Sequence, residues 1–137
     1  MADTPIPDDE LQRRLAAELP HWRLEDGWIR RQFRTGGWKS TMLAVSTIGH
    51  LAEAAWHHPD LVVSFAFVRV KLRTHSADGI TAKDLALAAK IEQVLMWRPQ
   101  DEPGSPLEGT PDEPRFRHMK HEPAAPAGNV SAAPGSA

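Results

Sequence analysis

The stretch EAAWHHPDLVVSFAFVRVKLRT, from Glu53 to Thr74, changes its hydrophobic periodicity at Pro59, where a predicted helix is followed by predicted strand. Before Pro59, apolar residues recur every three or four positions from Trp38 to Trp56, which predicts a long amphipathic helix. After it, Val and Phe dominate, and from Val68 apolar residues alternate with basic ones, which predicts a strand with one buried face. No Gly, Asn or Pro marks a turn in residues 62–68, so these residues leave open whether one strand or two follow the helix.

Two further helices and a hairpin flank this stretch. Asp8 to Glu18 has leucines on one side, and Glu25-Asp26-Gly27 is a turn signal that predicts a hairpin of two short strands. Thr81 is expected to cap a last helix that runs to about Met96 and has Asp84 in its first turn. The residues expected on buried helix faces are Leu11, Leu15 and Leu19, then Met42, Val45, Ile48, Ala52 and Ala55, and finally Leu85, Ala88, Ala89 and Ile91.

The resulting order is helix, two strands, helix, one or two strands, helix. This order describes an α+β domain in which helices cover one face of an antiparallel sheet. A chain of 137 residues with a formal charge of -2 fits one such domain, which we assign to residues 1–98. The charge balance calls for neither nucleic acid nor an anionic membrane as a partner.

Residues 99–137 differ in composition from the domain, and we expect this C-terminal extension to be partly or wholly disordered. Eight of the 12 prolines lie between Pro99 and Pro134, so the segment cannot bury enough apolar surface to offset its ordering entropy. The part from Arg115 to Met119 carries Phe and Met and is the exception, because it can pack back on the domain.

Several classes of protein are disfavoured by what the chain lacks. The absence of Cys excludes disulfides, thiolate zinc sites and cysteine nucleophiles. The stretch from Met1 to Glu10 is acidic, where a secretory signal needs basic and then apolar residues. The longest apolar run, Leu61 to Val68, is far shorter than the ~20 residues of a membrane-spanning helix. We therefore expect a cytoplasmic protein.

Five polar residues are the candidates for chemistry. Glu53 and His57 are four residues apart near a helix end, so we expect the carboxylate to hydrogen-bond the imidazole and orient it. His58 follows directly, His75 closes the second apolar segment, and Asp84 begins the last helix. Taken singly, each has an ordinary structural explanation, as a helix-end cap or a solvated helix acid. Three imidazoles can also bind zinc, but adjacent helical residues point roughly 100° apart, which disfavours a metal site.

In combination, these residues resemble the signature of the pterin-4a-carbinolamine dehydratases. The resemblance covers roughly Leu11 to Trp97 and implies the order α-β-β-α-β-β-α, with a four-stranded antiparallel sheet and three helices on one face. The family commonly has Tyr-Asn where this chain has Phe65-Ala66, and an aromatic residue where it has Leu61. The matching positions are Glu53-x-x-x-His57-His58-Pro59, Phe65, Thr74-His75-x-x-x-Gly79-Ile80-Thr81-x-x-Asp84-x-x-Leu87-Ala88, and Asp26-Gly27 with Ile29 and Phe33.

The resemblance implies that the chain removes water from 4a-hydroxytetrahydropterin to give quinonoid dihydropterin, in the recycling of tetrahydropterin. Hydroxide needs a proton in order to leave and the pterin N5–H must lose one, which imidazoles can do near neutral pH without a metal or a cofactor. His57 and His75 are then the acid–base candidates, and His58 holds or polarises the pterin. Glu53 orients His57, and Asp84 supports a histidine or the pterin.

The resemblance also implies partners and one alternative function. Members of the family form homodimers or homotetramers, and an aromatic amino acid hydroxylase is an expected functional partner. The family includes a transcriptional coactivator and Rubisco assembly factors, so a catalytically silent binding or assembly protein is the alternative. The complete set of five polar residues favours catalysis, because a scaffold has little physical reason to keep it.

Overall fold

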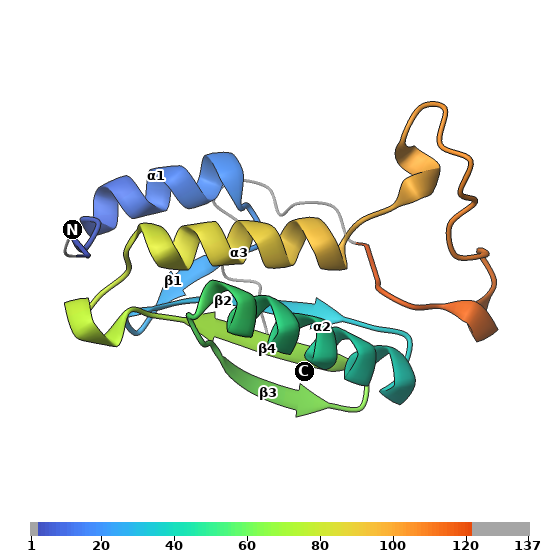
Figure 1. Ribbon diagram of the computed structural model, residues 1–137, viewed down its shortest axis with the longest axis horizontal. Coiled ribbons are helices and arrows are strands. Elements are labelled where there is room, and N and C mark those ends of the chain that lie inside the picture. Colours follow the sequence, from blue (N-terminus) through green and yellow to red (C-terminus); the bar gives the residue numbers. More distant parts are fainter. Residues whose placement is uncertain (1–2, 122–137) are drawn as a thin grey trace.

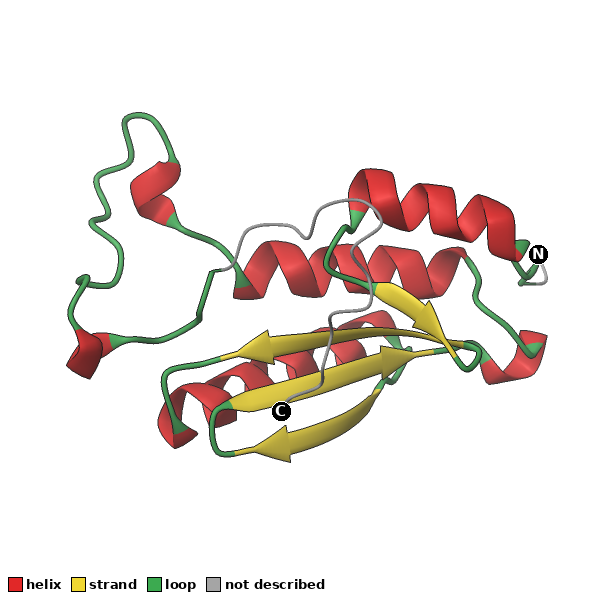
Figure 2. Cartoon of the chain, turned by 180° about the vertical axis from the view of Figure 1, so that it is seen from behind, coloured by secondary structure: helices red, strands yellow, loops and turns green. Residues whose placement is uncertain are grey.

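The computed structural model describes residues 3–121 of the 137-residue chain, and its elements follow the predicted α+β order. Four antiparallel strands form one sheet in the order β1-β2-β4-β3, and three helices lie on one face of it. Figure 1 shows α2 in front of the sheet, and Figure 2 shows the sheet in front of α2 from the opposite side. The elements are α1 (Asp8–Glu18), β1 (Arg23–Glu25), β2 (Trp28–Arg34), α2 (Trp38–Ala55), β3 (Asp60–Ser64), β4 (Phe67–Leu72) and α3 (Ala82–Leu95).

Two tight hairpins build the sheet. The first is the predicted one, because Glu25 pairs with Trp28 and both turn residues, Asp26 and Gly27, have positive φ as a type I′ turn requires. In the second hairpin Ser64 pairs with Phe67, so the apolar segment after α2 forms two strands and the sheet has four. This turn was not predictable from turn residues, since neither Phe65 nor Ala66 has a positive φ.

The hydrophobic core lies between the sheet and the helices. β4 contributes Val68, Val70 and Leu72, which are fully buried, as the alternation of apolar and basic residues predicts. Leu11, Leu15 and Leu19 are buried in the same core, also as predicted. Within residues 3–121 no helix is both long enough and apolar enough to cross a membrane.

Three residues predicted to face inward are exposed instead: Met42, Ala55 and Ala89. In α2 the buried positions are offset by one from Met42, because Thr41 points inward and its hydroxyl donates to the Phe65 carbonyl at 3.0 Å. The Thr35 hydroxyl lies 2.7 Å from the Thr41 hydroxyl, so polar contacts accompany the inward orientation of Thr41. The hydrophobic pattern of α2 could not predict this rotation, because the inward residue Thr41 is polar. In α3 the inward positions are Leu85, Leu87, Ala88, Ile91 and Leu95.

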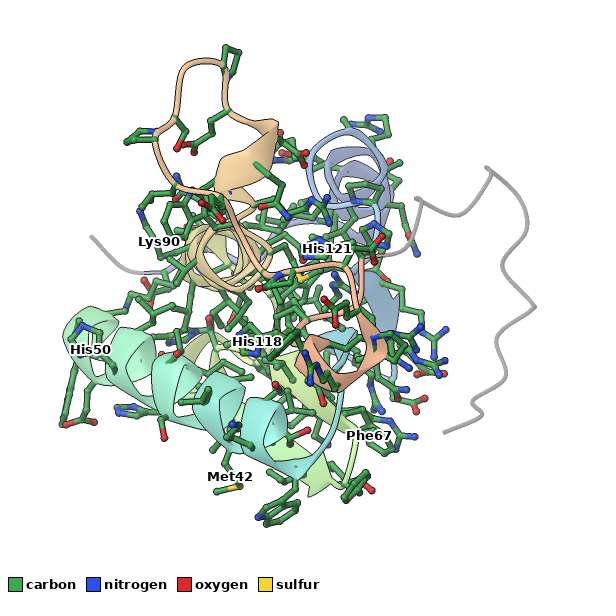
Figure 3. All side chains as sticks on the ribbon, turned by 90° about the vertical axis from the view of Figure 1, so that its right-hand side faces the viewer. Met42, His50, Phe67, Lys90, His118 and His121 are labelled. Carbon is green, nitrogen blue, oxygen red and sulfur yellow. The ribbon has the colours of Figure 1, made fainter. Side chains whose placement is uncertain are left out.

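The segment 117–120 returns to the domain, as the apolar residues near Met119 predicted. It continues the sheet beside the end of β2: the Gly36 N–H donates to the His118 carbonyl at 2.7 Å, and the Lys120 N–H donates to the Arg34 carbonyl at 2.8 Å. His118 Nδ1 also lies 2.7 Å from the Ser40 hydroxyl. Figure 3 shows His118 and His121 where this segment crosses one end of the molecule. Residues 122–137 lie outside the described part, so disorder of the extension stays a prediction.

Candidate active site

Asp84 is a fully buried carboxylate at the beginning of α3. Its Oδ2 accepts hydrogen bonds from the Thr81 N–H at 2.9 Å and from the Thr74 hydroxyl at 2.6 Å. Because the Thr74 hydroxyl hydrogen is used on Asp84, the Thr81 hydroxyl, 2.8 Å away, is the donor to Thr74. Thr81 in turn accepts from the Lys83 N–H, so the capping box of the helix holds the carboxylate in one position.

His57 uses the other oxygen of this carboxylate. Its Nε2 lies 2.7 Å from Asp84 Oδ1, and its side chain is 14 % exposed. While Asp84 is ionised it can only accept, so Nε2 carries the proton of this hydrogen bond. Nδ1 is then the ring nitrogen left to exchange a proton. A buried carboxylate that orients an imidazole in this way is an arrangement suited to acid–base chemistry.

The predicted hydrogen bond between Glu53 and His57 is wrong. Glu53 Oε1 instead lies 2.7 Å from His58 Nε2, and both of these side chains are exposed. The helix ends at Ala55, one residue earlier than predicted, and His57 therefore no longer follows the helical spacing on which the prediction depended. An exposed pair of this kind contributes little to stability.

The helix end that reorients His57 is a Schellman motif with an unusual residue in it. Trp56 has φ 55° and ψ 45°, the left-handed conformation that glycine usually supplies at this position. Its N–H donates to the Glu53 carbonyl at 3.2 Å, and the His57 N–H donates to the Ala52 carbonyl at 3.1 Å. A bulky residue in this conformation costs about 1 kcal/mol or more. The Trp56 side chain is 75 % exposed and packs edge-to-face with His58 at 5.0 Å.

His75 lies near His57 because the residue before it, Thr74, binds the same carboxylate. It directly follows Thr74, which is bound to Asp84, so one carboxylate joins His57 to the residue that precedes His75. The His75 ring is exposed and packs edge-to-face with Trp28 at 5.6 Å, and the Lys71 ammonium lies 4.2 Å above the same Trp28 ring. Figure 1 shows the end of α2, the loop after β4 and the start of α3 side by side.

Sequence comparison assigns the domain to a known family. The pterin 4 alpha carbinolamine dehydratase family matches residues 4–94. The chain belongs to this family. All five predicted site residues lie inside the matched region, whereas the segment 117–120 lies outside it.

Similar proteins and a similar structure agree with this assignment. A protein of Aquifex aeolicus, provisionally named a pterin-4-alpha-carbinolamine dehydratase, is 44% identical over 90 residues, which are 66% of this chain and 90% of that protein. A protein of Chloroflexus aurantiacus with the same provisional name is 40% identical over 90 residues, 66% of this chain and 96% of that one. The crystal structure of a transcriptional coactivator/pterin dehydratase from Brucella melitensis aligns with a TM-score of 0.63 at 26% identity. It covers 67% of this chain and 99% of the Brucella chain.

Two features of the candidate site were not foreseen from the sequence. Thr74 binds Asp84, and no local pattern identifies a threonine that precedes a histidine as the partner of a residue ten positions later. The left-handed conformation of Trp56 is the other, because nothing about a tryptophan suggests a left-handed helix end. The Thr81-x-x-Asp84 spacing, by contrast, is a recognisable capping-box pattern.

No group of three or more His, Asp or Glu side chains in residues 3–121 is arranged to hold a metal ion. His57 and His58 point to different carboxylates, Asp84 and Glu53, rather than to a common centre. The predicted absence of a metal and of a cofactor stays a prediction.

Proposed function

We propose that the chain removes water from a 4a-hydroxytetrahydropterin to form a quinonoid dihydropterin, as part of tetrahydropterin recycling. Membership of the pterin 4 alpha carbinolamine dehydratase family supports the substrate class. The observation that carries the proposed acid–base mechanism is the 2.7 Å hydrogen bond between His57 and the fully buried Asp84.

The reaction requires one proton to be given and one to be taken. The C4a–O bond breaks as the hydroxyl group receives a proton and leaves as water, because hydroxide is a poor leaving group. N5 loses its proton, and its electron pair forms the double bond to C4a. One proton is given and one is taken, so the reaction has no net change in protons. An imidazole can do either near neutral pH, because it can act as an acid or as a base there.

We assign the proton transfers to His57 and His75, with Nδ1 of His57 as the exchanging atom because Asp84 occupies Nε2. His58 is proposed to hold or polarise the pterin. Its Nε2 is oriented by Glu53, so Glu53 supports His58 in this mechanism rather than His57. The proposed substrate-binding residues are His57, His58 and His75. Asp84, predicted as a fourth, is fully buried and both of its oxygens are bonded within the protein, so we propose that it acts through His57.

The test is the rate of dehydration of synthetic 4a-hydroxytetrahydropterin by purified protein in chelator, compared with spontaneous breakdown. We expect strong acceleration by the wild type and its loss in His57→Ala and in His75→Ala. His50→Ala is the matched control, because His50 is an exposed histidine of the same helix α2, and it should retain full activity. A folded wild type that does not exceed the spontaneous rate would contradict the proposal.

A second candidate function is binding or assembly without catalysis. The similar Brucella structure is titled both a transcriptional coactivator and a pterin dehydratase, which favours a protein partner as the alternative. Absence of catalysis by folded protein would favour this role. A homodimeric or homotetrameric state, a hydroxylase partner and a cytoplasmic location stay predictions.

A further inference from the structure

Trp56 occupies a backbone position that favours glycine, and its side chain does not contribute to the core. Its φ is 55°, and its peptide N–H completes the Schellman motif at the end of α2. The side chain is 75 % exposed, so its burial cannot offset the cost of this conformation. Glycine would form the same helix end with less strain. The stability of the fold therefore gives no reason for an indole at this position.

The position of the indole suggests what it does. Its ring packs edge-to-face with the His58 ring, with 5.0 Å between the ring centroids and 83° between the planes. His58 is held on Glu53 Oε1, and the next residue of the chain, His57, is held on Asp84. The Trp56 ring is thus fixed beside the candidate site while most of its surface faces solvent. Backbone strain that the fold does not need is typical of residues that serve a function.

We propose that Trp56 is a substrate-binding residue, whose indole stacks on the planar pyrimidine half of a reduced pterin at this site. The inference rests on the proposed function, because it names a further residue that binds the same substrate. A flat heterocycle and an indole attract one another through their π faces, and removing such a ring lowers affinity about tenfold or more. The ring carries no group that can transfer a proton in the reaction, so it should affect binding rather than the chemical step.

The experiment compares Trp56→Gly and Trp56→Phe with the wild type in three measurements. These are kcat and KM for dehydration, calorimetric binding of 7,8-dihydropterin as a probe without a 4a-hydroxyl group, and the thermal midpoint. Trp56→Gly should raise KM and the Kd of the probe about tenfold, change kcat less than twofold, and leave the midpoint unchanged or higher. Trp56→Phe keeps an aromatic face and should retain most of the affinity.

Trp38→Ala is the matched control. Trp38 is 53 % exposed at the opposite end of α2, about 27 Å away along an 18-residue helix, and its removal should leave KM and Kd unchanged. Unchanged probe affinity in Trp56→Gly overturns the inference. If the variant then also differs from the wild type in molecular mass in solution, the ring belongs to a protein interface instead.

The outcomes separate this inference from the proposed function. If the wild type binds the probe and Trp56→Gly does not, but neither accelerates dehydration, the role of Trp56 is supported and the proposed reaction fails. If the wild type is active and Trp56→Gly has the same KM and Kd, only the inference fails. If the wild type neither binds the probe nor accelerates dehydration, both are overturned.

Discussion

At the scale of single residues, Asp84 determines which proton His57 can exchange. Oδ2 has two donors, the Thr81 N–H from the helix cap and the Thr74 hydroxyl from the segment that follows β4. Oδ1 therefore remains for the imidazole. The orientation of His57 in the candidate site is thus set by a carboxylate that makes no contact with solvent.

Asp84→Asn should reverse the His57 tautomer. The asparagine oxygen would accept from Thr81 and Thr74 as Oδ2 does, so its NH₂ group would face His57 and make Nε2 the acceptor. Nδ1 would then carry the proton, and we expect kcat/KM to fall about a hundredfold, the range of a lost acid–base group. Nitrogen NMR of the histidine ring measures the tautomer directly. An active variant with the wild-type tautomer would contradict this role of Asp84.

At the scale of elements, the segment 117–120 occupies the edge of β2 that the three-residue strand β1 leaves uncovered. Gly36 permits this contact, because a Cβ atom at that position would lie 2.2 Å from the Arg117 carbonyl oxygen. An exposed strand edge is otherwise a site for pairing with other chains.

Gly36→Ala should release the segment from the sheet without unfolding the domain. Hydrogen exchange should show loss of protection at the Lys120 N–H, which bonds to the Arg34 carbonyl, while the β2–β4 ladder stays protected. Gly49→Ala is the control, since an added Cβ there meets no atom within 4 Å. Alanine in that helix should stabilise the protein by up to about 1 kcal/mol. A protected Lys120 amide in Gly36→Ala would disprove the steric explanation.

The docking of the same segment should weaken in mild acid. Burial and the nearby charges of Arg98, Arg31 and His118 lower the pKa of His121 below its ordinary 6.5, although Asp101 partly opposes them. Because the docked state holds the proton of His121 less tightly, docking is favoured above pH 6.5, where the imidazole is neutral. This contribution is lost as the pH falls through the lowered pKa. Protection of the Lys120 amide should therefore decrease below pH 6.5 in the wild type. It should decrease less in His121→Gln.

At the scale of the whole molecule, one ion pair ties the sheet to the helical layer. Arg31 on β2 donates from Nε and Nη2 to the two carboxylate oxygens of Glu92 on α3, both at 2.9 Å. The Trp22 indole N–H donates to the same carboxylate from the loop after α1. Three regions of the chain therefore meet at Glu92.

Glu92 should make the stability of the domain sensitive to acid. Burial raises the pKa of its carboxyl group, but the hydrogen bond and charge of Arg31 and the hydrogen bond of Trp22 outweigh this, so the pKa lies below its ordinary 4.5. The lowered pKa stabilises the fold above about pH 4.5, and this contribution is lost as the pH falls through the folded-state pKa.

Glu92→Gln should destabilise the protein by about 2 kcal/mol at neutral pH, because it weakens charge-assisted hydrogen bonds. The difference from the wild type should shrink as the pH falls below 4.5. Denaturant unfolding at neutral and acidic pH measures both effects. A constant difference across this range would mean that Glu92 does not titrate as described.

Features that depend on near neighbours in the chain could be predicted from the residues alone. The helix from Asp8 to Glu18, the hairpin at Asp26-Gly27 and the cap at Thr81 have local causes, namely periodicity, positive φ and a capping oxygen. For the same reason, the position of Asp84 in the first turn of α3 could be predicted. The five-residue pattern was sufficient to suggest the family.

Which side chains meet depends on how the elements pack against one another. His57 binds Asp84, 27 residues away, instead of Glu53, because the left-handed residue Trp56 turns the chain out of the helical spacing. The contact of the segment 117–120 with β2 likewise depends on a partner distant in sequence. The fourth strand has a near partner, but its turn at Phe65-Ala66 carries no residue that marks it. Such hydrogen bonds form only when elements pack in one arrangement, and no pattern within a single element specifies that arrangement.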